Sequence, residues 1–339
     1  MQKLTFIVLL MVGVASSQNF VSNVSKVGTT AGEILSFPGS ARGMALGNAV
    51  GGLTEDATVF FWNPASAATV KSLLISASYL PWFVDTRVQH FSVVVPLRQQ
   101  FVLGAFISTW SMDDMPVRTE IEQEGTGQFF DAGDMVIAVS AARALTDRFA
   151  IGANIKYVQE RIWHSVARGT AIDFGTSYTT NLFNGLKVIV VLSNYGTDMQ
   201  MDGRDMDIVH DPDPTIEGNN NLIPAEYGLD VWSLPLNFRF GLATDIIKSK
   251  QLRVSAEVDA IHPSNNYEAI DAGVEISLWN SVFLRLGSSS LQQDDSIEGF
   301  SLGGGVIVPT SFGSIAVDYG YRDFGHLGFL QAVTISFTS

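Results

Sequence analysis

Charged side chains recur at every second position of several apolar segments in the second half of the sequence. In the clearest segment, residues 252–260, aliphatic side chains share one face, whereas Arg253, Glu257 and Asp259 share the other. Such residues could serve as acids, bases or an ion path, but their signs alternate between successive segments. Mutual pairing across neighbouring strands is therefore the simpler interpretation. The charged residues with this spacing include Arg239, Arg253, Glu257, Asp271, Glu275, Arg285 and Asp318.

Known enzymatic motifs are missing from the sequence. The five His residues are scattered, and neither His-Glu-x-x-His nor Gly-x-Ser-x-Gly occurs. Gly303, Gly304 and Gly305 lie within a predicted strand, not in a phosphate-binding turn between a strand and a helix. The chain has no Cys, which excludes disulfides and thiolate-bound metal ions. We predict that the protein is not an enzyme and binds no cofactor and no metal.

The alternation extends through most of the chain and indicates β-strands of about ten residues. The sequence is 46% hydrophobic and only 16% charged, although it has no long hydrophobic helix. A membrane β-barrel explains both facts, because its strands distribute apolar residues over many short segments. We predict an all-β fold, a transmembrane antiparallel β-barrel of about 14 strands. The predicted strands are residues 71–80, 87–96, 101–110, 134–144, 147–160, 168–179, 185–194, 235–246, 251–261, 268–279, 281–289, 299–308, 313–322 and 329–338.

Two connections between predicted strands are long and acidic. Residues 111–133 and 195–234 both follow odd-numbered strands, whereas the connections after even-numbered strands are short turns. Short periplasmic turns opposite longer external loops are typical of bacterial barrels, and they place the N-terminal segment on the periplasmic side. The two loops contribute net charges of −5 and −8 to the chain's −14. The acidity therefore belongs to the predicted outer face.

These acidic loops have more than one interpretation. They can be solvated loops that couple through divalent cations to the anionic headgroups of outer-membrane lipid and lipopolysaccharide, or a docking surface for a secreted partner. A calcium site in residues 202–213 would lack the Asp-x-Asp-x-Asp-Gly spacing with a closing Glu. Nucleic acid is not an expected partner, because negative charge repels its phosphates.

The first residues have the three parts of a secretory signal peptide. Lys3 precedes an apolar run from Leu4 to Val14, and small residues follow before Gln18. The run is too short to span a bilayer. We predict a signal peptide at residues 1–17, an N-terminal periplasmic and plug segment at 18–69, and an outer-membrane barrel at 70–339.

Residues 39–67 have the composition of a packed insert. Gly and Ala recur, and one Arg and two acids stand among apolar neighbours. Asn63 and Pro64 require the chain to turn before the first strand. We predict that residues 40–67 occupy the barrel lumen as a plug. Arg42 should lie beside inward carboxylates, because a lone buried guanidinium is very costly.

The same segment contains an ordered set of motifs. They are Arg42 and Gly43 after two small residues, Gly47, the acidic pair Glu55 and Asp56, and Trp62-Asn63-Pro64-Ala65. This set resembles the N-terminal segment of the PorV/PorQ family of outer-membrane proteins, which is similar to the FadL-type transporters. The chain departs from the family at Leu46-Gly47-Asn48, where a second Met-Gly step is common, and at Ser66, where the family often has Gly.

The resemblance implies two alternative functions. PorV-like barrels act in type IX secretion, where they bind the C-terminal sorting domain of secreted proteins and deliver this cargo for surface attachment with other secretion-system components. A FadL-like barrel passes hydrophobic compounds across the outer membrane, and Gly47 would then border the passage. The motifs are nearer to the PorV-like proteins, so cargo binding is the first expectation and transport the alternative. Both imply export to the outer membrane of a Gram-negative cell.

Overall fold

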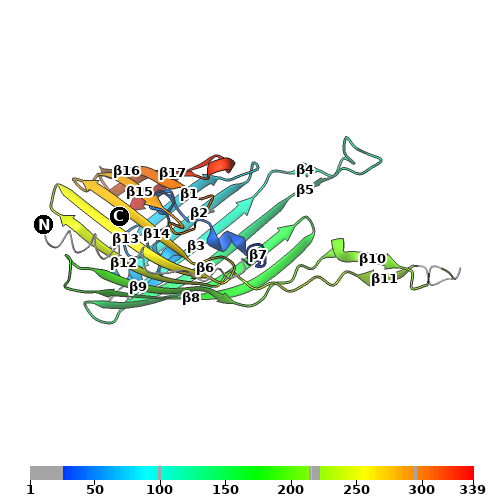
Figure 1. Cartoon of the computed structure of the whole chain (residues 1–339), viewed down its shortest axis with the longest axis horizontal. Helices are drawn as coiled ribbons and strands as arrows, with labels where there is room; N and C mark the ends of the chain where they lie inside the picture. Colours follow the sequence, from blue (N-terminus) through cyan, green and yellow to red (C-terminus); the bar gives the residue numbers. More distant parts are fainter. Residues whose placement is uncertain (1–25, 98–100, 214, 216–221, 294–295) are drawn as a thin grey trace.

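The computed structural model describes residues 26–97, 101–213, 215, 222–293 and 296–339, and most of them form a closed antiparallel β-barrel (Figure 1). Each of its 14 strands pairs with the barrel strands before and after it, and the first strand closes on the last. The barrel strands are β1 (Leu74–Pro81), β2 (Arg87–Pro96), β3 (Phe101–Ser111), β6 (Ala132–Ala144), β7 (Phe149–Ile162), β8 (Ser165–Thr179), β9 (Lys187–Gly196), β12 (Asn237–Lys248), β13 (Leu252–Pro263), β14 (Ala269–Leu278), β15 (Val282–Ser288), β16 (Phe300–Thr310), β17 (Gly313–Asp323) and β18 (Phe329–Thr338).

The predicted all-β barrel of 14 strands is confirmed. Strands β2 and β18 begin and end at the predicted residues, and no other boundary differs by more than three residues. Period-two alternation predicts these strands well because successive side chains of a strand point alternately to the lumen and to the outer surface.

Both long insertions form hairpins that project from the same end of the barrel. Strand β4 (Met115–Pro116) pairs with β5 (Phe129–Phe130), and β10 (Asp207–His210) pairs with β11 (Ile223–Glu226). We call this the hairpin end, and the opposite end, with the short connections and the C-terminus, the turn end. In Figure 1 the hairpins extend to the right, and the C-terminus lies to the left.

The barrel wall is apolar outside and polar over much of its inner face, although the inner faces of β3 and β6 are largely apolar. In the paired strands β17 and β18, Val317 and Ile335 are exposed, whereas Asp318 and Thr334 on the other face are buried. Such an outer face is suited to contact with lipid, because its side chains gain nothing from water. The inner face carries the charged residues whose alternation the sequence displays.

The helices among the described residues are short. In the N-terminal segment they are η1 (Glu33–Ser36), α2 (Ala41–Ala45), α3 (Val59–Trp62) and η2 (Pro64–Thr69), and in the connections at the hairpin end η3 (Arg204–Met206) and η4 (Gly325–Leu327). None of the helices within the described residues is long and apolar enough to cross a membrane.

Residues 40–67, the plug, lie inside the barrel and are mostly buried. Helix α2 packs against β15 to β18, and η2 packs against β3, β6, β7 and β8. Between these two contacts, Gly52 and Leu53 bind strand β13 through their backbone amides. The plug therefore contacts several separate sectors of the wall.

The sequence predicted the whole N-terminal segment on the side of the short turns, but its first described residues lie at the hairpin end. The backbone amide of Ala31 donates to the carbonyl oxygen of Ser233, and that of Gly32 donates to Glu160 Oε1 at 2.5 Å. Both partners belong to the hairpin end. Residues 30–36 are held there by polar groups, so the chain enters the lumen from the hairpin end and reaches β1 at the turn end.

The placement of both long hairpins at one end predicts where proteases cut the protein in intact cells. Arg118 is exposed at the hairpin end, and Lys248 and Lys250 are exposed at the turn end. If the hairpins face outward, trypsin added to intact cells should cleave the protein after Arg118. Cleavage after Lys250 should require a permeabilised outer membrane. Mass spectrometry of the fragments distinguishes the two sites. Cleavage of intact cells at Lys250 alone would reverse the orientation.

Candidate functional site

Arg42 is the only positively charged residue of the plug, and it binds the barrel wall. It lies in α2, whose first turn is capped by Ser40 Oγ, which accepts from the amide of Gly43 at 3.1 Å. The Arg42 Nε and Nη2 atoms donate to the two carboxylate oxygens of Glu275 at 3.0 and 2.9 Å. The predicted contact between Arg42 and an inward carboxylate is confirmed.

Further ion pairs extend this contact on both sides. Asp56 lies 3.3 Å from Arg42 Nη1, and Glu275 also accepts from Arg285 Nε at 2.7 Å. Arg285 in turn contacts Asp318 at 2.5 Å. Burial alone would lower the pKa of Arg42, but Glu275 and Asp56 outweigh this effect and hold the pKa above its usual value. A chain of alternating charges therefore attaches the plug to β14, β15 and β17.

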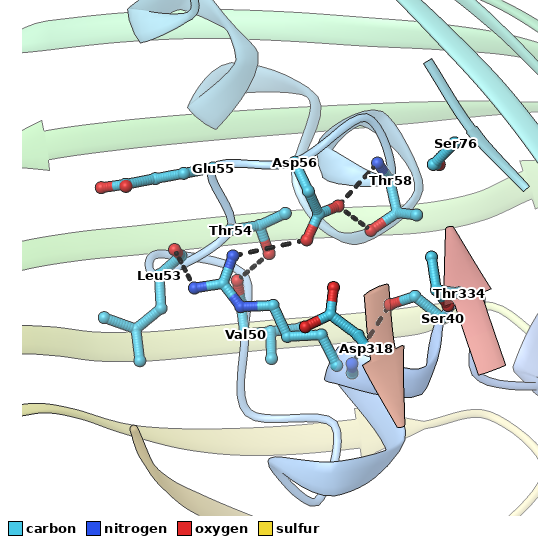
Figure 2. Close-up of polar contacts among 12 residues, drawn as sticks. Ser40, Val50, Leu53, Thr54, Glu55, Asp56, Thr58, Ser76, Asp318 and Thr334 are labelled. Atoms are coloured by element: carbon cyan, nitrogen blue, oxygen red, sulfur yellow. Dashed lines mark hydrogen bonds and ion pairs between the residues drawn. The ribbon is translucent and has the colours of Figure 1, made fainter. Parts of the chain in front are cut away.

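The two adjacent acids of the plug have different partners. Glu55 pairs with Arg253 of β13 at 3.2 Å. Asp56, besides its contact with Arg42, accepts from the backbone amide of Thr58 at 2.8 Å, which fixes the turn before α3 (Figure 2). Figure 2 also shows Asp318 of the wall near this part of the plug.

The predicted pairing among the lumen charges is confirmed for several residues. Arg285 and Glu275 are direct neighbours on β15 and β14. Arg239 of β12 contacts Asp259 of β13 at 2.5 Å. These pairs are enclosed between plug and wall, where an unpaired charge would be destabilising.

Two predicted lumen charges bind backbone amides instead of basic side chains. Glu257 accepts from the amides of Gly52 and Leu53 in the plug at 2.8 and 2.9 Å. Asp271 accepts from the amide of Ser290 at 3.0 Å. The alternation in the sequence predicts which side chains face the lumen. It does not predict the partners that another segment of the chain places there. The predicted ion pairs between neighbouring strands are therefore not the main contacts of Glu257 and Asp271, whose hydrogen bonds come from backbone amides.

The remaining residues of the motif set pack the plug together. Trp62 lies against Gly43, where an added Cβ would be 2.2 Å from the indole ring. Asn63 caps η2, because its Oδ1 accepts from the amide of Ala65 at 3.0 Å, and Pro64 occupies the first turn of that helix. All these contacts are structural.

Gly47 does not border an open passage. Its φ of +62° is in the left-handed region, and an added Cβ would lie 2.5 Å from the backbone nitrogen of Ser288 in the wall. The expectation that Gly47 lines a transport path is therefore wrong. This residue allows the plug backbone to approach the wall backbone directly.

Two apolar pockets lie at the hairpin end, and sequence patterns did not indicate them. The first, the methionine pocket, has a volume of about 430 Å³. Its walls come from η3, from the connection between β9 and β12, from β7 and β8, and from the N-terminal segment. The lining residues are Ala31, Glu160, Ile162, Trp163, Ser165, Ala167, Met199, Met201, Asp205, Met206, Leu229 and Trp232.

A second apolar pocket, the rim pocket, has a volume of about 360 Å³ and shares Glu160, Ile162 and Met201 with the first. Glu33 connects the rim pocket to a more polar cavity of about 240 Å³, the vestibule, which reaches Trp62 of the plug. The three cavities therefore follow one another from the hairpin end to the plug.

The β9–β12 connection is fastened over the methionine pocket. Asp205 of η3 accepts from His164 Nδ1 at 2.8 Å and from the His164 backbone amide at 3.1 Å. Met199 and Trp232 exchange backbone hydrogen bonds at 2.8 and 2.9 Å. These contacts hold together segments that are far apart in sequence, so only the tertiary structure forms the pocket.

The lumen and its mouth lack the groupings that metal chemistry requires. Within the described part of the chain, no three His, Asp or Glu side chains come together in a way that could hold a metal ion.

No family model matches the sequence, and no relative is found among curated proteins. Solved structures of outer-membrane channels do match in fold. The Pseudomonas putida toluene transporter TodX is 12% identical, with a TM-score of 0.51 over 88% of this chain and 97% of its own. A Pseudomonas aeruginosa FadL homologue is 12% identical, with a TM-score of 0.52 over 89% and 98%. The Ralstonia pickettii toluene transporter TbuX is 12% identical, with a TM-score of 0.52 over 88% and 97%.

The chain is thus a closed 14-stranded barrel whose plug, residues 40–67, lies in the lumen. It has the fold of the FadL-type channels.

Removal of the Arg42 charge should loosen the plug. Arg42→Met leaves Asp56 without its basic partner and removes both bonds to Glu275, so we expect a loss of about 3 kcal/mol in the free energy of unfolding. Urea unfolding of the purified barrel measures this value. Arg118→Met, which removes an exposed charge from the β4–β5 hairpin, is the matched control and should change little. Equal effects of both variants would contradict the assigned contact.

Gly47→Ala separates a steric clash from backbone strain. Both Gly47 and Gly28 have positive φ, but an added Cβ at Gly28 meets nothing within 4 Å. We expect Gly47→Ala to destabilise the protein by about 1–3 kcal/mol more than Gly28→Ala, because the new methyl group would collide with the wall backbone. Thermal unfolding of the two variants provides the comparison. A difference near zero would show that the plug does not press against β15.

Proposed function

We propose that the protein is an outer-membrane barrel that passes hydrophobic compounds into the cell. The observation that carries this proposal is the methionine pocket, an apolar cavity of about 430 Å³ at the hairpin end. Water is a poor competitor for such a surface, and flexible thioether side chains adapt to ligands of different shape. The predicted signal peptide and the apolar outer wall support a location in a Gram-negative outer membrane.

The order of the cavities supports a path toward the plug. A compound in the methionine pocket adjoins the rim pocket through Ile162 and Met201, and the rim pocket adjoins the vestibule. Passage beyond the vestibule requires the plug to move or the wall to open, since Trp62 and its neighbours fill the lumen below. The solved structures with this fold include two toluene transporters, which favours transport over the alternative.

Cargo binding in the manner of the PorV/PorQ family is the second candidate. The observation that favours it is the pair of long insertions that form the projecting hairpins (Figure 1), which contribute −5 and −8 to the chain's net charge of −14. Secreted proteins with a C-terminal sorting domain would then bind exposed hairpin surface, and the lumen would have no part in binding.

Uptake of naphthalene by cells that express the protein tests the first proposal. Met206→Asn places a polar amide in the methionine pocket and should lower uptake about fivefold, because one apolar contact of roughly 1 kcal/mol is lost. Val209→Asn is the matched control. It makes the same kind of change on the same connection, at an exposed residue outside the pocket, and should leave uptake unchanged.

The two candidates give opposite results when the hairpin is shortened. Removal of residues 208–225 leaves the lining of the methionine pocket in place, so naphthalene uptake should persist. If uptake does not exceed that of cells lacking the protein, and the shortened variant loses surface attachment of secreted proteins, the cargo proposal replaces transport.

A further inference from the structure

Charge is distributed differently in the deep lumen and at its mouth. Around the plug, the acids face basic groups or backbone amides, as in the pairs of Arg42 with Glu275 and Arg239 with Asp259. At the mouth, Glu33, Asp134 and Glu160 line the rim pocket. Within the described residues, none of these three carboxylates forms an ion pair with Lys or Arg.

The hydrogen bonds of these carboxylates do not neutralise them. Glu160 Oε1 accepts from the amide of Gly32, and Glu33 Oε1 accepts from Thr30 and from Asn265 Nδ2 at 2.6 and 3.0 Å. Asp134 is the direct cross-strand partner of Glu160, and Glu33 lines the same pocket. All these donors are uncharged.

Basic residues are nearly missing from the lining of the two apolar pockets. Among the described residues that line them, Arg161 is the only Arg or Lys. It is already bound by Asp131, whose pKa this hydrogen bond holds below its usual value. The methionine pocket adds a further carboxylate, that of Asp205. The two pockets thus combine an apolar surface with the carboxylates of Glu33, Asp134 and Glu160, which no Lys or Arg pairs with among the described residues.

Aromatic rings in the pocket linings are a second kind of group that attracts cations. Trp163 and Trp232 line the methionine pocket, and Trp110 lines the rim pocket. The face of an indole ring attracts cations, more strongly where water is excluded. A hydrophobic ammonium group meets both kinds of partner here, whereas a fatty-acid carboxylate meets like charge.

We propose that the two mouth pockets bind hydrophobic ammonium compounds in preference to anionic amphiphiles, and that Glu160, which borders both pockets, is the residue that sets this preference. The proposal rests on the proposed function and specifies its substrate class. Neutral hydrophobic compounds bind through the apolar surface alone and lie between the two charged classes in affinity.

The test uses three probes that share one ring system: (2-naphthylmethyl)trimethylammonium, 2-methylnaphthalene and 2-naphthylacetate. Calorimetric titration of the full-length protein in a non-ionic detergent measures their affinities at low and high salt. We expect the ammonium probe to bind about tenfold more tightly than the carboxylate at low salt. This difference should shrink in high salt, because the pockets are open to solvent.

Glu160→Gln should weaken the ammonium probe about fivefold and leave 2-methylnaphthalene unchanged. Glu124→Gln makes the same substitution on the β4–β5 hairpin, outside both pockets, and is the matched control. Asp134→Asn provides a second variant if loss of the Gly32 contact disturbs folding, and it should weaken the ammonium probe in the rim pocket in the same direction.

Equal affinities of the ammonium and carboxylate probes, with 2-methylnaphthalene still bound, would overturn the charge preference and leave the proposed function intact. Failure of all three probes to bind would overturn the proposed function itself. If Glu160→Gln weakens all three probes alike, its role is to anchor Gly32, and the assignment of Glu160 to selectivity is wrong.

Discussion

Charged side chains can face the lumen of this barrel because the plug completes their hydrogen bonds and ion pairs. A guanidinium or carboxylate enclosed between wall and plug is stable only with a partner, since water no longer solvates it. Arg42 meets this requirement for Glu275, and the amides of Gly52 and Leu53 meet it for Glu257. The wall and the plug are therefore complementary parts of one buried polar network, and neither can be understood alone.

The same constraint divides the barrel into two regions with different properties. Where the plug fills the lumen, charges are compensated and side chains are closely packed. Toward the hairpin end, the plug gives way to cavities, and the carboxylates there face open space and apolar side chains. Binding of an external compound is favoured in the second region, because the plug fills the first.

The motif residues that resemble the PorV/PorQ family serve structural purposes in this chain. Arg42, Trp62 and Asn63 orient the plug, and Gly47 allows its close contact with the wall. A plug of this design suits a barrel that transports small molecules as well as one that binds cargo on its loops. This explains why the motifs by themselves could not distinguish the two functions. The residues that would distinguish transport from cargo binding lie at the hairpin end, outside the motif set.

The sequence alone determined the barrel, because period-two alternation is a local property that each strand displays independently. The alternation also identified the charged residues that face the lumen. The sequence further predicted that Arg42 contacts a carboxylate, because burying an unpaired charge is costly in any fold. Only the tertiary structure decided which carboxylate that is, and that Glu257 binds the plug backbone. The tertiary structure also places Met199, Met206 and Trp232 against β7 and β8, where they form the methionine pocket. Such contacts join segments distant in sequence, and no local pattern encodes which distant groups meet.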